Sequence, residues 1–175
     1  MTNCIASERD ERRPDMKKRE SRKKPPIALF RRPGFLVRRL HQIYVAIYFQ
    51  NCQRFGTTPV QSSVMQVLLA QPGMDQIALA QEIGIDRTTA SSVLTRLEAR
   101  GIVRREADSL DRRNKRAFLT PAGQSMLQEM QVSIEAAHRE LVKPLAPAAR
   151  DQFLEQLLCL VQANNDKGRS PLRSL

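Results

Sequence analysis

Apolar residues recur at helical spacing along most of the chain after residue 34, and strand-like alternation is confined to one short region. The first helical run starts at Phe35 and has two neighbouring apolar faces, which predicts burial on two sides. These faces consist of Leu36, Leu40, Ile43 and Ile47, and of Val37, His41, Tyr44 and Tyr48. "GTTPVQSSVMQVLLAQPG" predicts a second helix, because Thr58 can cap it, Pro59 suits the first helical position and Gly73 can close it.

The stretch "MDQIALAQEIGIDRTTASSVLTRLEARGIV" predicts two helices joined by a tight turn. Asp75 can cap the first helix and Gly84 ends it, while Asp86 can cap a second helix that runs to Arg100. Gly101 then suits a left-handed residue just after the helix end. The order helix, turn, helix is typical of a DNA-binding unit. The inward face of the second helix is predicted to consist of Ala90, Val93, Leu94 and Leu97.

The opposite face of this second helix is rich in hydroxyl groups. It carries Thr88, Ser91, Ser92 and Thr95, with Arg87 at its leading end. Small hydroxyl side chains beside an arginine can approach a DNA groove closely and bond to bases or phosphates. The face is therefore a candidate for reading the major groove.

Two short strands, residues 102–107 and Lys115–Leu119, follow and are joined by the polar loop "DSLDRRN". A hairpin directly after a helix-turn-helix predicts the wing of a winged helix-turn-helix. Arg112 and Arg113 at its tip can enter the minor groove, where a narrow A·T-rich duplex has enhanced negative potential. Asp111 can hold a neighbouring guanidinium group in one orientation.

The remaining helices have no place inside a compact winged domain. A long helix is predicted from Thr120 and Pro121 to about Val142, and a last helix follows Pro147. Together with the first helix, they are predicted to form an oligomerisation platform. The predicted fold class is mainly α with a small β-hairpin wing.

Charge favours a polyanionic partner. The 175-residue chain has 29 Lys and Arg against 18 Asp and Glu, a net charge of +11, and residues 1–33 carry 11 of the basic and 5 of the acidic residues. Low aromatic content, 5% with no Trp, argues against a stacking surface for single strands and favours duplex DNA. Two interpretations of the basic tail stay open: additional phosphate contacts, or a solvated extension.

Other classes of protein are disfavoured. No apolar stretch approaches the roughly 20 residues of a spanning helix, and no secretory signal pattern begins the chain, so a soluble cytoplasmic protein with no membrane partner is expected. The three cysteines are widely spaced and form no CxxC pair, which disfavours a disulfide framework or a zinc site. With two histidines, no HExxH and no glycine-rich phosphate loop, neither an enzyme nor a cofactor is expected.

Three motifs together resemble the MarR family of bacterial transcription regulators, over residues 35 to about 165. They are "TPVQSSVMQVL", "ALAQEIGIDRTTASSVLTRLEARGIVRR" and "DRRNKRAFLTPAG". The resemblance implies a homodimer whose first, fifth and sixth helices interlock, with each subunit presenting one winged helix to an inverted-repeat DNA operator. Its wing signature falls on Asp111 and Arg113, which implies Arg113 in the minor groove and Arg112 beside a phosphate. The implied major-groove residues are Arg87, Thr88, Thr89, Ser91, Ser92 and Thr95.

The resulting domain division has four parts. They are a disordered basic tail (1–33), a helical dimerisation region (34–56 and 121–165), a winged helix-turn-helix DNA-binding domain (57–120) and a disordered C-terminal tail (166–175). Repression relieved by a ligand is the commoner mode in the family, and it is expected here from the resemblance alone.

Family members commonly respond to small aromatic or anionic compounds bound between the dimer helices and the winged domain. The stretch "PGFLVRRLHQIYVAIYF" is similar to the subgroup that senses aromatic acids or their coenzyme A thioesters. An arginine near a half-buried histidine can bind a carboxylate while tyrosine rings pack on an aromatic body. The candidates are Arg38, Arg39, His41, Tyr44 and Tyr48. Alternatively, the rings are dimer-core residues and the arginines are surface cations.

Two further alternatives stay open. Some relatives sense peroxides through a cysteine, and Cys52 is the candidate, with Arg54 as the only nearby cation in sequence. A buried, inert Cys52 is the other interpretation of the same residue. A winged helix can also coat DNA without sequence preference or bind another protein.

Overall fold

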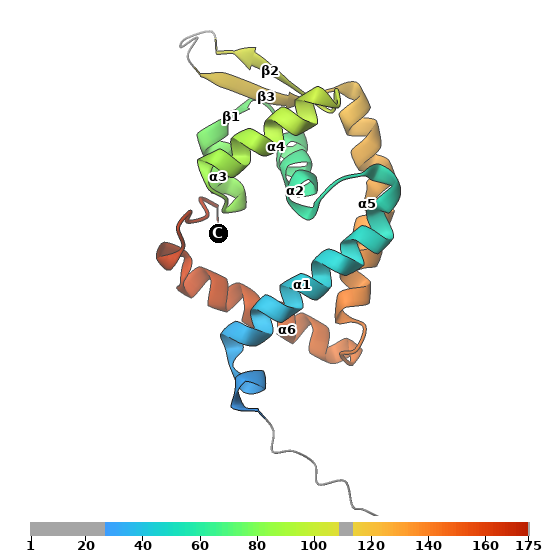
Figure 1. Cartoon of the computed structure of the whole chain (residues 1–175), viewed down its shortest axis with the longest axis vertical. Coiled ribbons are helices and arrows are strands. Elements are labelled where there is room, and N and C mark those ends of the chain that lie inside the picture. The colour runs from blue at the N-terminus through green and yellow to red at the C-terminus, as the bar shows by residue number, and fades with distance from the viewer. Residues whose placement is uncertain (1–26, 109–113, 175) are drawn as a thin grey trace, which may run out of the picture.

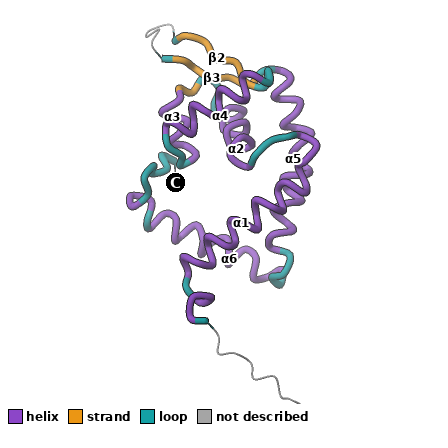
Figure 2. The backbone as a smooth tube through the Cα atoms, in the orientation of Figure 1, coloured by secondary structure: helices purple, strands orange, loops and turns teal. Residues whose placement is uncertain are grey.

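The computed structural model describes residues 27–108 and 114–174, and the predicted fold class is confirmed: helices dominate, with one small antiparallel sheet. The elements in chain order are η1 (Ala28–Arg31), α1 (Pro33–Cys52), η2 (Gln53–Phe55), α2 (Pro59–Ala70), β1 (Met74–Asp75), α3 (Gln76–Ile83), α4 (Arg87–Ala99), β2 (Val103–Ala107), β3 (Lys115–Leu119), α5 (Pro121–Val142), α6 (Pro147–Ala163) and η3 (Asn165–Lys167). The sheet and α2–α4 form one end of the molecule, α1 and α6 lie toward the other, and α5 runs between them (Figure 1). The tube view in Figure 2 shows that strands occur only at the winged end.

Local signals set the helix boundaries in the winged part. Thr58 forms a capping box with Gln61 at the start of α2, and Asp75 and Asp86 accept backbone N–H bonds at the starts of α3 and α4. Gly84 ends α3 in the left-handed conformation, at φ 67°. These boundaries match the sequence prediction. The end of α2 differs, because that helix stops at Ala70.

The sheet has one strand that the sequence pattern did not indicate. Its order is β1-β3-β2, with Val103 opposite Leu119 and Ala107 opposite Lys115 in the hairpin. The added strand β1 is only two residues long and pairs with β3. Gly73, predicted to close α2, instead precedes β1 with φ 80° and donates its N–H to the Ala117 carbonyl at 2.9 Å. The pairing ties the start of α3 to the wing.

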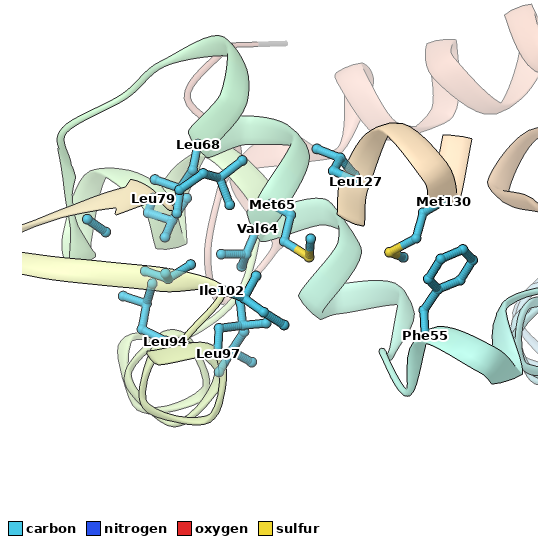
Figure 3. Packing of buried hydrophobic residues seen from close by; sticks show 14 of the residues in the cluster. Phe55, Val64, Met65, Leu68, Leu79, Leu94, Leu97, Ile102, Leu127 and Met130 are labelled. Carbon is cyan, nitrogen blue, oxygen red and sulfur yellow. The ribbon is translucent and has the colours of Figure 1, made fainter. Parts of the chain in front are cut away.

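One continuous core lies under the helix-turn-helix and extends to α1 and α5. Leu79 of α3, Leu94 and Leu97 of α4 and Met65 of α2 are 0–1% exposed. Figure 3 shows Phe55 and Met130 facing each other at the other end of this cluster, where α1 leads into α2 beside α5. The winged part is therefore packed directly on the helices that carry it.

The junction between the wing and α5 is tight. Thr120 caps α5 and donates its hydroxyl to the Gly101 carbonyl at 2.7 Å, while its own N–H bonds the Ile102 carbonyl at 3.0 Å. A Cβ at Gly123 would overlap that Ile102 carbonyl. Only glycine allows the first turn of α5 to lie so close to the strand that follows α4.

Both termini depart from the predicted boundaries. Residues 27–33 were expected to belong to a disordered tail, yet 28–31 form η1, where Phe30 packs on Phe35 with ring centroids 5.6 Å apart, and α1 begins at Pro33. The disordered tail expected from residue 166 is also a wrong prediction for 166–174. These residues include the end of η3 and return to α3 through hydrogen bonds from Arg173 and Ser174.

The helices outside the winged part leave apolar surface uncovered. α1 packs along α5, but α6 has no buried residue.

Within residues 27–108 and 114–174, no helix is long and apolar enough to cross a membrane, and no group of metal-ligating side chains is present.

Candidate nucleic-acid interface

The hydroxyl-rich face of α4 points away from the core. Its inward residues are buried: Ala90, Val93, Leu94 and Leu97. On the other side Arg87, Thr88, Ser92 and Thr95 are exposed, and Thr89 and Ser91 are half-buried. The exposed part of the predicted face is thus available to a partner and is not packed in the core.

The leading end of α4 is held rigidly. Asp86 accepts the Thr89 N–H at 2.9 Å and the Thr89 hydroxyl at 2.6 Å, and these hydrogen bonds hold the pKa of the Asp86 carboxyl below its usual range. From α3, the Gln76 side-chain amide donates to the Arg87 carbonyl at 2.9 Å. The Thr89 hydroxyl is therefore engaged in capping, which limits its part in any DNA contact.

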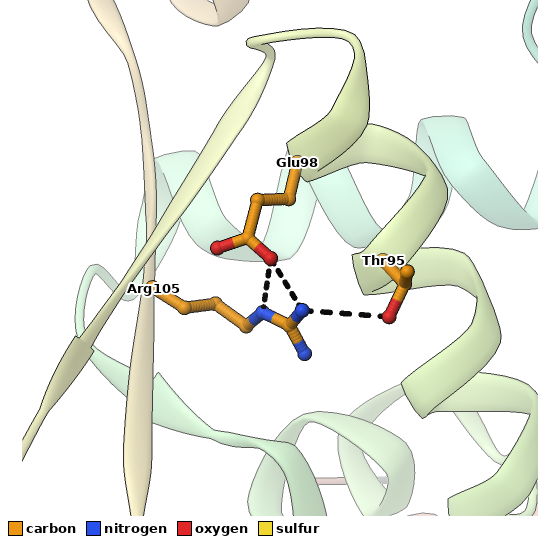
Figure 4. Close-up of polar contacts among 3 residues, drawn as sticks. All are labelled: Thr95, Glu98 and Arg105. Carbon is orange, nitrogen blue, oxygen red and sulfur yellow. Dashed lines mark hydrogen bonds and ion pairs between the residues drawn. The ribbon is translucent and has the colours of Figure 1, made fainter.

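Arg105 of β2 joins the wing to the recognition helix (Figure 4). Its Nε donates to Glu98 Oε2 at 2.9 Å, its Nη2 also contacts that oxygen, and Nη2 donates to the Thr95 hydroxyl at 3.4 Å. The hydrogen bond from Arg105 lowers the pKa of Glu98. The arrangement fixes the base of the hairpin against the last turns of α4.

The hairpin base carries further cations. Arg104 lies over the Phe118 ring at 4.5 Å and pairs with Glu106, and Arg116 pairs with Asp108. The predicted tip residues Asp111, Arg112 and Arg113 lie outside the described residues. Their assignment therefore rests on sequence.

A polar cleft of about 380 Å³ lies between α3, α4 and the base of the hairpin. Its cationic lining residues are Arg87, Arg105, Lys115 and Arg173, which come from α4, β2, β3 and the C-terminal residues. Sequence analysis did not assign Arg105, Lys115 or Arg173 to the interface. The alternation of β2 and β3 was the only available signal for the first two, and no local pattern marked Arg173.

Comparison with known proteins places this geometry in a family. The MarR family model matches residues 55–114, from the end of η2 to the residue before β3. The transcriptional regulator HosA of Escherichia coli O127:H6 is 30% identical over 98 residues, which cover 56% of this chain and 73% of HosA. The chain belongs to the MarR family. It is a transcriptional regulator of the MarR type, and its helix-turn-helix and hairpin are the winged helix of that family.

Solved structures of MarR-type regulators show the same fold. Bordetella bronchiseptica BpsR, in a structure that concerns regulation of its DNA binding by 6-hydroxynicotinic acid, is 29% identical over 78% of this chain and 97% of its own, with a TM-score of 0.72. The repressor CouR bound to a 23-mer DNA duplex is 28% identical over 76% and 94%, with a TM-score of 0.71. CouR of Rhodococcus jostii RHA1 bound to p-coumaroyl-CoA is 25% identical over 75% and 93%, with a TM-score of 0.65.

The residues proposed from sequence to bind an effector do not converge within one protomer. His41, expected to be half-buried, is exposed, and so are Arg38 and Arg39. Arg38 lies over the Phe35 ring at 5.4 Å, and Arg39 donates to Gln42 at 3.3 Å. In this 20-residue helix these three side chains lie about two to three turns before Tyr48, the first buried residue of α1, and solvent still reaches them.

The two tyrosines do lie together. Tyr48 is buried, and its hydroxyl is 3.0 Å from the Thr57 hydroxyl. The Tyr44 ring stacks on His138 of α5, with centroids 5.4 Å apart. Burial raises the pKa of both phenols. Tyr48 thus has a satisfied polar end, as the core interpretation expects, whereas Tyr44 remains half-buried beside α5.

Cys52 is in an unfavourable setting for a redox sensor. Its side chain is 1% exposed in the core, and burial raises the pKa of the thiol despite the lowering effect of Arg54. A reactive thiol needs access and a lowered pKa. The geometry therefore favours the inert interpretation of Cys52.

Proposed function

We propose that this MarR-type regulator binds an inverted-repeat operator in double-stranded DNA as a homodimer, with α4 of each subunit in a major groove. One observation carries the proposal: α4 presents an exposed row of hydroxyls and Arg87, and none of that face is used by the core. Two such helices related by dimer symmetry must meet successive major grooves roughly 34 Å apart. The CouR structure with a DNA duplex supports the same use of the fold.

The hydroxyls of α4 divide into two groups. Those of Thr89 and Thr95 are hydrogen-bonded to Asp86 and Arg105. Those of Thr88, Ser91 and Ser92 make no hydrogen bond within residues 27–108 and 114–174, and we assign them to the base edges or phosphates of the groove. Each good base contact accounts for about 1–3 kcal/mol of discrimination.

The roles of the hairpin-tip residues are proposed from the sequence. We propose Arg113 in the minor groove, Arg112 at a neighbouring phosphate and Asp111 as the residue that orients them. The fixed hairpin base supports this, because Arg105 and Glu98 hold β2 against α4. Replacing Arg113 by Ala is expected to weaken operator binding while the dimer stays intact.

The proposed homodimer would cover the apolar surface that α1 and α6 leave exposed. Leu154 and Leu160 of α6 and Val37 of α1 are 55–60% exposed, which is unusual for large apolar side chains in a row of helices. We therefore assign the helical region, α1, α5 and α6, to dimerisation and the part from α2 to β3 to DNA binding. Sedimentation equilibrium is expected to give twice the 19.9 kDa of the chain.

We further propose that the protein is a repressor released by a small aromatic acid or its coenzyme A thioester. BpsR, whose DNA binding is regulated by 6-hydroxynicotinic acid, and CouR, bound to p-coumaroyl-CoA, support this effector class. Of the candidate residues, Tyr44 fits best, since its ring is half-buried between α1 and α5. Arg38, Arg39 and His41 would meet the compound only with a second subunit placed over α1.

The operator proposal is tested by footprinting on the promoter region of this gene, followed by titration of the protected duplex and of a random duplex. An affinity ratio of roughly 10³ or more is expected. Thr88→Val should lower operator affinity and leave random-duplex affinity unchanged, whereas Arg139→Gln on α5 should alter neither. Equal affinity for both duplexes would instead indicate a DNA-coating protein, and no binding to either would favour a protein-interaction module.

The effector proposal needs its own measurement. A panel of benzoates, cinnamates and their coenzyme A esters is titrated into the operator complex, and thermal unfolding is followed in parallel. A member of the panel is expected to raise the unfolding midpoint and release the DNA, and Tyr44→Ala should weaken both effects. If no compound of the panel changes either readout, the effector proposal is refuted, whereas the operator-binding proposal is not affected.

A further inference from the structure

The residues after α6 form a docked segment on the helix-turn-helix. Asn165 closes a loop with Leu172, donating its side-chain amide to the Leu172 carbonyl at 2.9 Å and accepting the Leu172 N–H at 2.8 Å. The next two residues bond to α3: the Arg173 N–H donates to the Gln81 carbonyl at 3.2 Å, and the Ser174 hydroxyl donates to Glu82 at 2.9 Å. We call residues 164–174 the C-terminal segment.

The turn of the helix-turn-helix is shaped to receive this segment. Leu172 lies across Gly84, where a Cβ would come within 3.0 Å of Leu172 Cδ2. The same glycine carries the left-handed turn between α3 and α4. In Figure 1 the red residues that follow α6 turn back toward α3. The segment is thus seated beside the start of the recognition helix.

Docking brings Arg173 to the lining of the cleft between α3, α4 and the hairpin base. Arg87 and Lys115 line the same cleft from α4 and β3. Among the described residues none of these three side chains has an ion pair or side-chain hydrogen bond. The fourth cation, Arg105, is neutralised by Glu98. The one carboxylate in the lining, Asp75, is engaged with the N–H groups of Ile77 and Ala78.

Four cations from separate elements face only two carboxylates, Asp75 in the lining and Glu98, which acts on both Arg105 and Lys115, so this polar cleft beside α4 has an excess of positive charge. Ion pairing inside a protein usually removes such clustering, whereas a polyanion stabilises it. The cleft adjoins the exposed end of α4 at Arg87, so the duplex strand that borders the groove would pass over it. A phosphate oxygen is a good acceptor for guanidinium and ammonium groups.

We propose that Arg173 binds a phosphate of the DNA backbone in this cleft, together with Arg87 and Lys115, and that the C-terminal segment is therefore part of the DNA interface. The inference rests on the proposed function, because it needs the α4 face to lie on DNA. Its recognition is sequence-independent, since a backbone phosphate carries no base information. Docking through backbone atoms leaves the Arg173 side chain available for this contact.

The test compares full-length wild-type protein with Arg173→Gln, Arg173→Lys and Arg139→Gln. Arg139→Gln is the matched control, because it removes one positive charge from a side chain on α5 that is 66% exposed and lies 3.5 Å from Glu135. Since α5 belongs to the proposed dimerisation region, sedimentation equilibrium verifies that this variant keeps the wild-type oligomeric state. Affinities for the protected operator duplex and for a random duplex are measured over a range of salt concentrations. Unfolding midpoints verify that the four proteins are equally folded.

Arg173→Gln is expected to lower the affinity for both duplexes by the same factor. It should also reduce the slope of log affinity against log salt by about 0.9 per phosphate contact, roughly 1.8 for a homodimer. Arg173→Lys should keep the wild-type slope, and Arg139→Gln should keep both slope and affinity. A slope for Arg173→Gln equal to that of Arg139→Gln would overturn the proposal, as would an equal loss in the Gln and Lys variants. Wild-type protein that binds neither duplex would refute the proposed function instead.

Discussion

The contact between the wing and the recognition helix allows a quantitative prediction. Arg105 donates two bonds to one Glu98 oxygen and a third to Thr95. Arg105→Met keeps the apolar stem of the side chain and removes the charge, and Glu98→Gln keeps the shape of its partner. The two single variants and the double variant form a thermodynamic cycle that isolates the pair.

The magnitude follows from exposure. Pairs of fully exposed charges contribute about 0.2–1 kcal/mol to the free energy of unfolding, and hydrogen bonds to charged groups roughly 1.5–3 kcal/mol. The Arg105 side chain is 17% exposed, but Glu98 is 38% exposed, so water screens the pair. We expect a coupling energy of about 1 kcal/mol, equivalent to a shift of roughly 2–4 °C in the unfolding midpoint for a chain of this size.

Denaturant unfolding at several pH values is the assay. The Glu98 pKa is lower in the folded protein than in the unfolded chain, where Glu titrates at about 4.3, so the stabilisation is complete above that value. It is lost as the pH falls through the folded-state pKa. A coupling energy near zero at pH 7, or one that does not decrease in acid, would refute the role given to this pair.

Three other predictions concern the scaffold of the interface. Gly123→Ala should destabilise the protein by about 1–3 kcal/mol, because its Cβ overlaps the Ile102 carbonyl, whereas Gly34→Ala, with nothing near its Cβ, should be tolerated; equal midpoints would contradict the close approach. In a Cys4→Ser/Cys159→Ser protein the remaining Cys52 should react with a thiol reagent only after unfolding, and rapid reaction in the native state would reopen the sensor interpretation. Asp86→Ala should lower the unfolding midpoint by removing the cap of α4, while Asp86→Asn should lower it less; the reverse order would show that the cap does not hold this helix.

The helix-turn-helix shows most clearly which features could be predicted from the sequence. Asp75, Gly84 and Asp86 act through bonds to residues at most three or four positions away, so their roles were predictable without knowing the fold. The apolar spacing of α4 likewise predicted which side faces the core. The hydroxyl-rich face followed as the complement of that pattern.

Contacts between segments far apart in the chain could not be predicted from the sequence. Strand β1 exists because β3 lies beside it, and its two residues carry no strand signal of their own. The Tyr48 hydroxyl has a buried partner because the fold places it beside Thr57, whose hydroxyl also donates to the Met130 sulfur of α5. Exposure of His41 could not be predicted for the same reason: helical period indicates a face, and only the neighbouring elements decide what covers it.

The C-terminal segment illustrates the division most directly. Its composition, with two arginines, a glycine and a proline after Lys167, is that of a tail, and taken alone it predicts disorder. Its order comes from Asn165, Gly84 and α3, which the chain brings together only after folding. Sequence alone thus determined the helices, their caps and the face offered to DNA, because these depend on bonds within a few residues. Tertiary structure alone decided which cations share a cleft, because that depends on where separate elements meet in space.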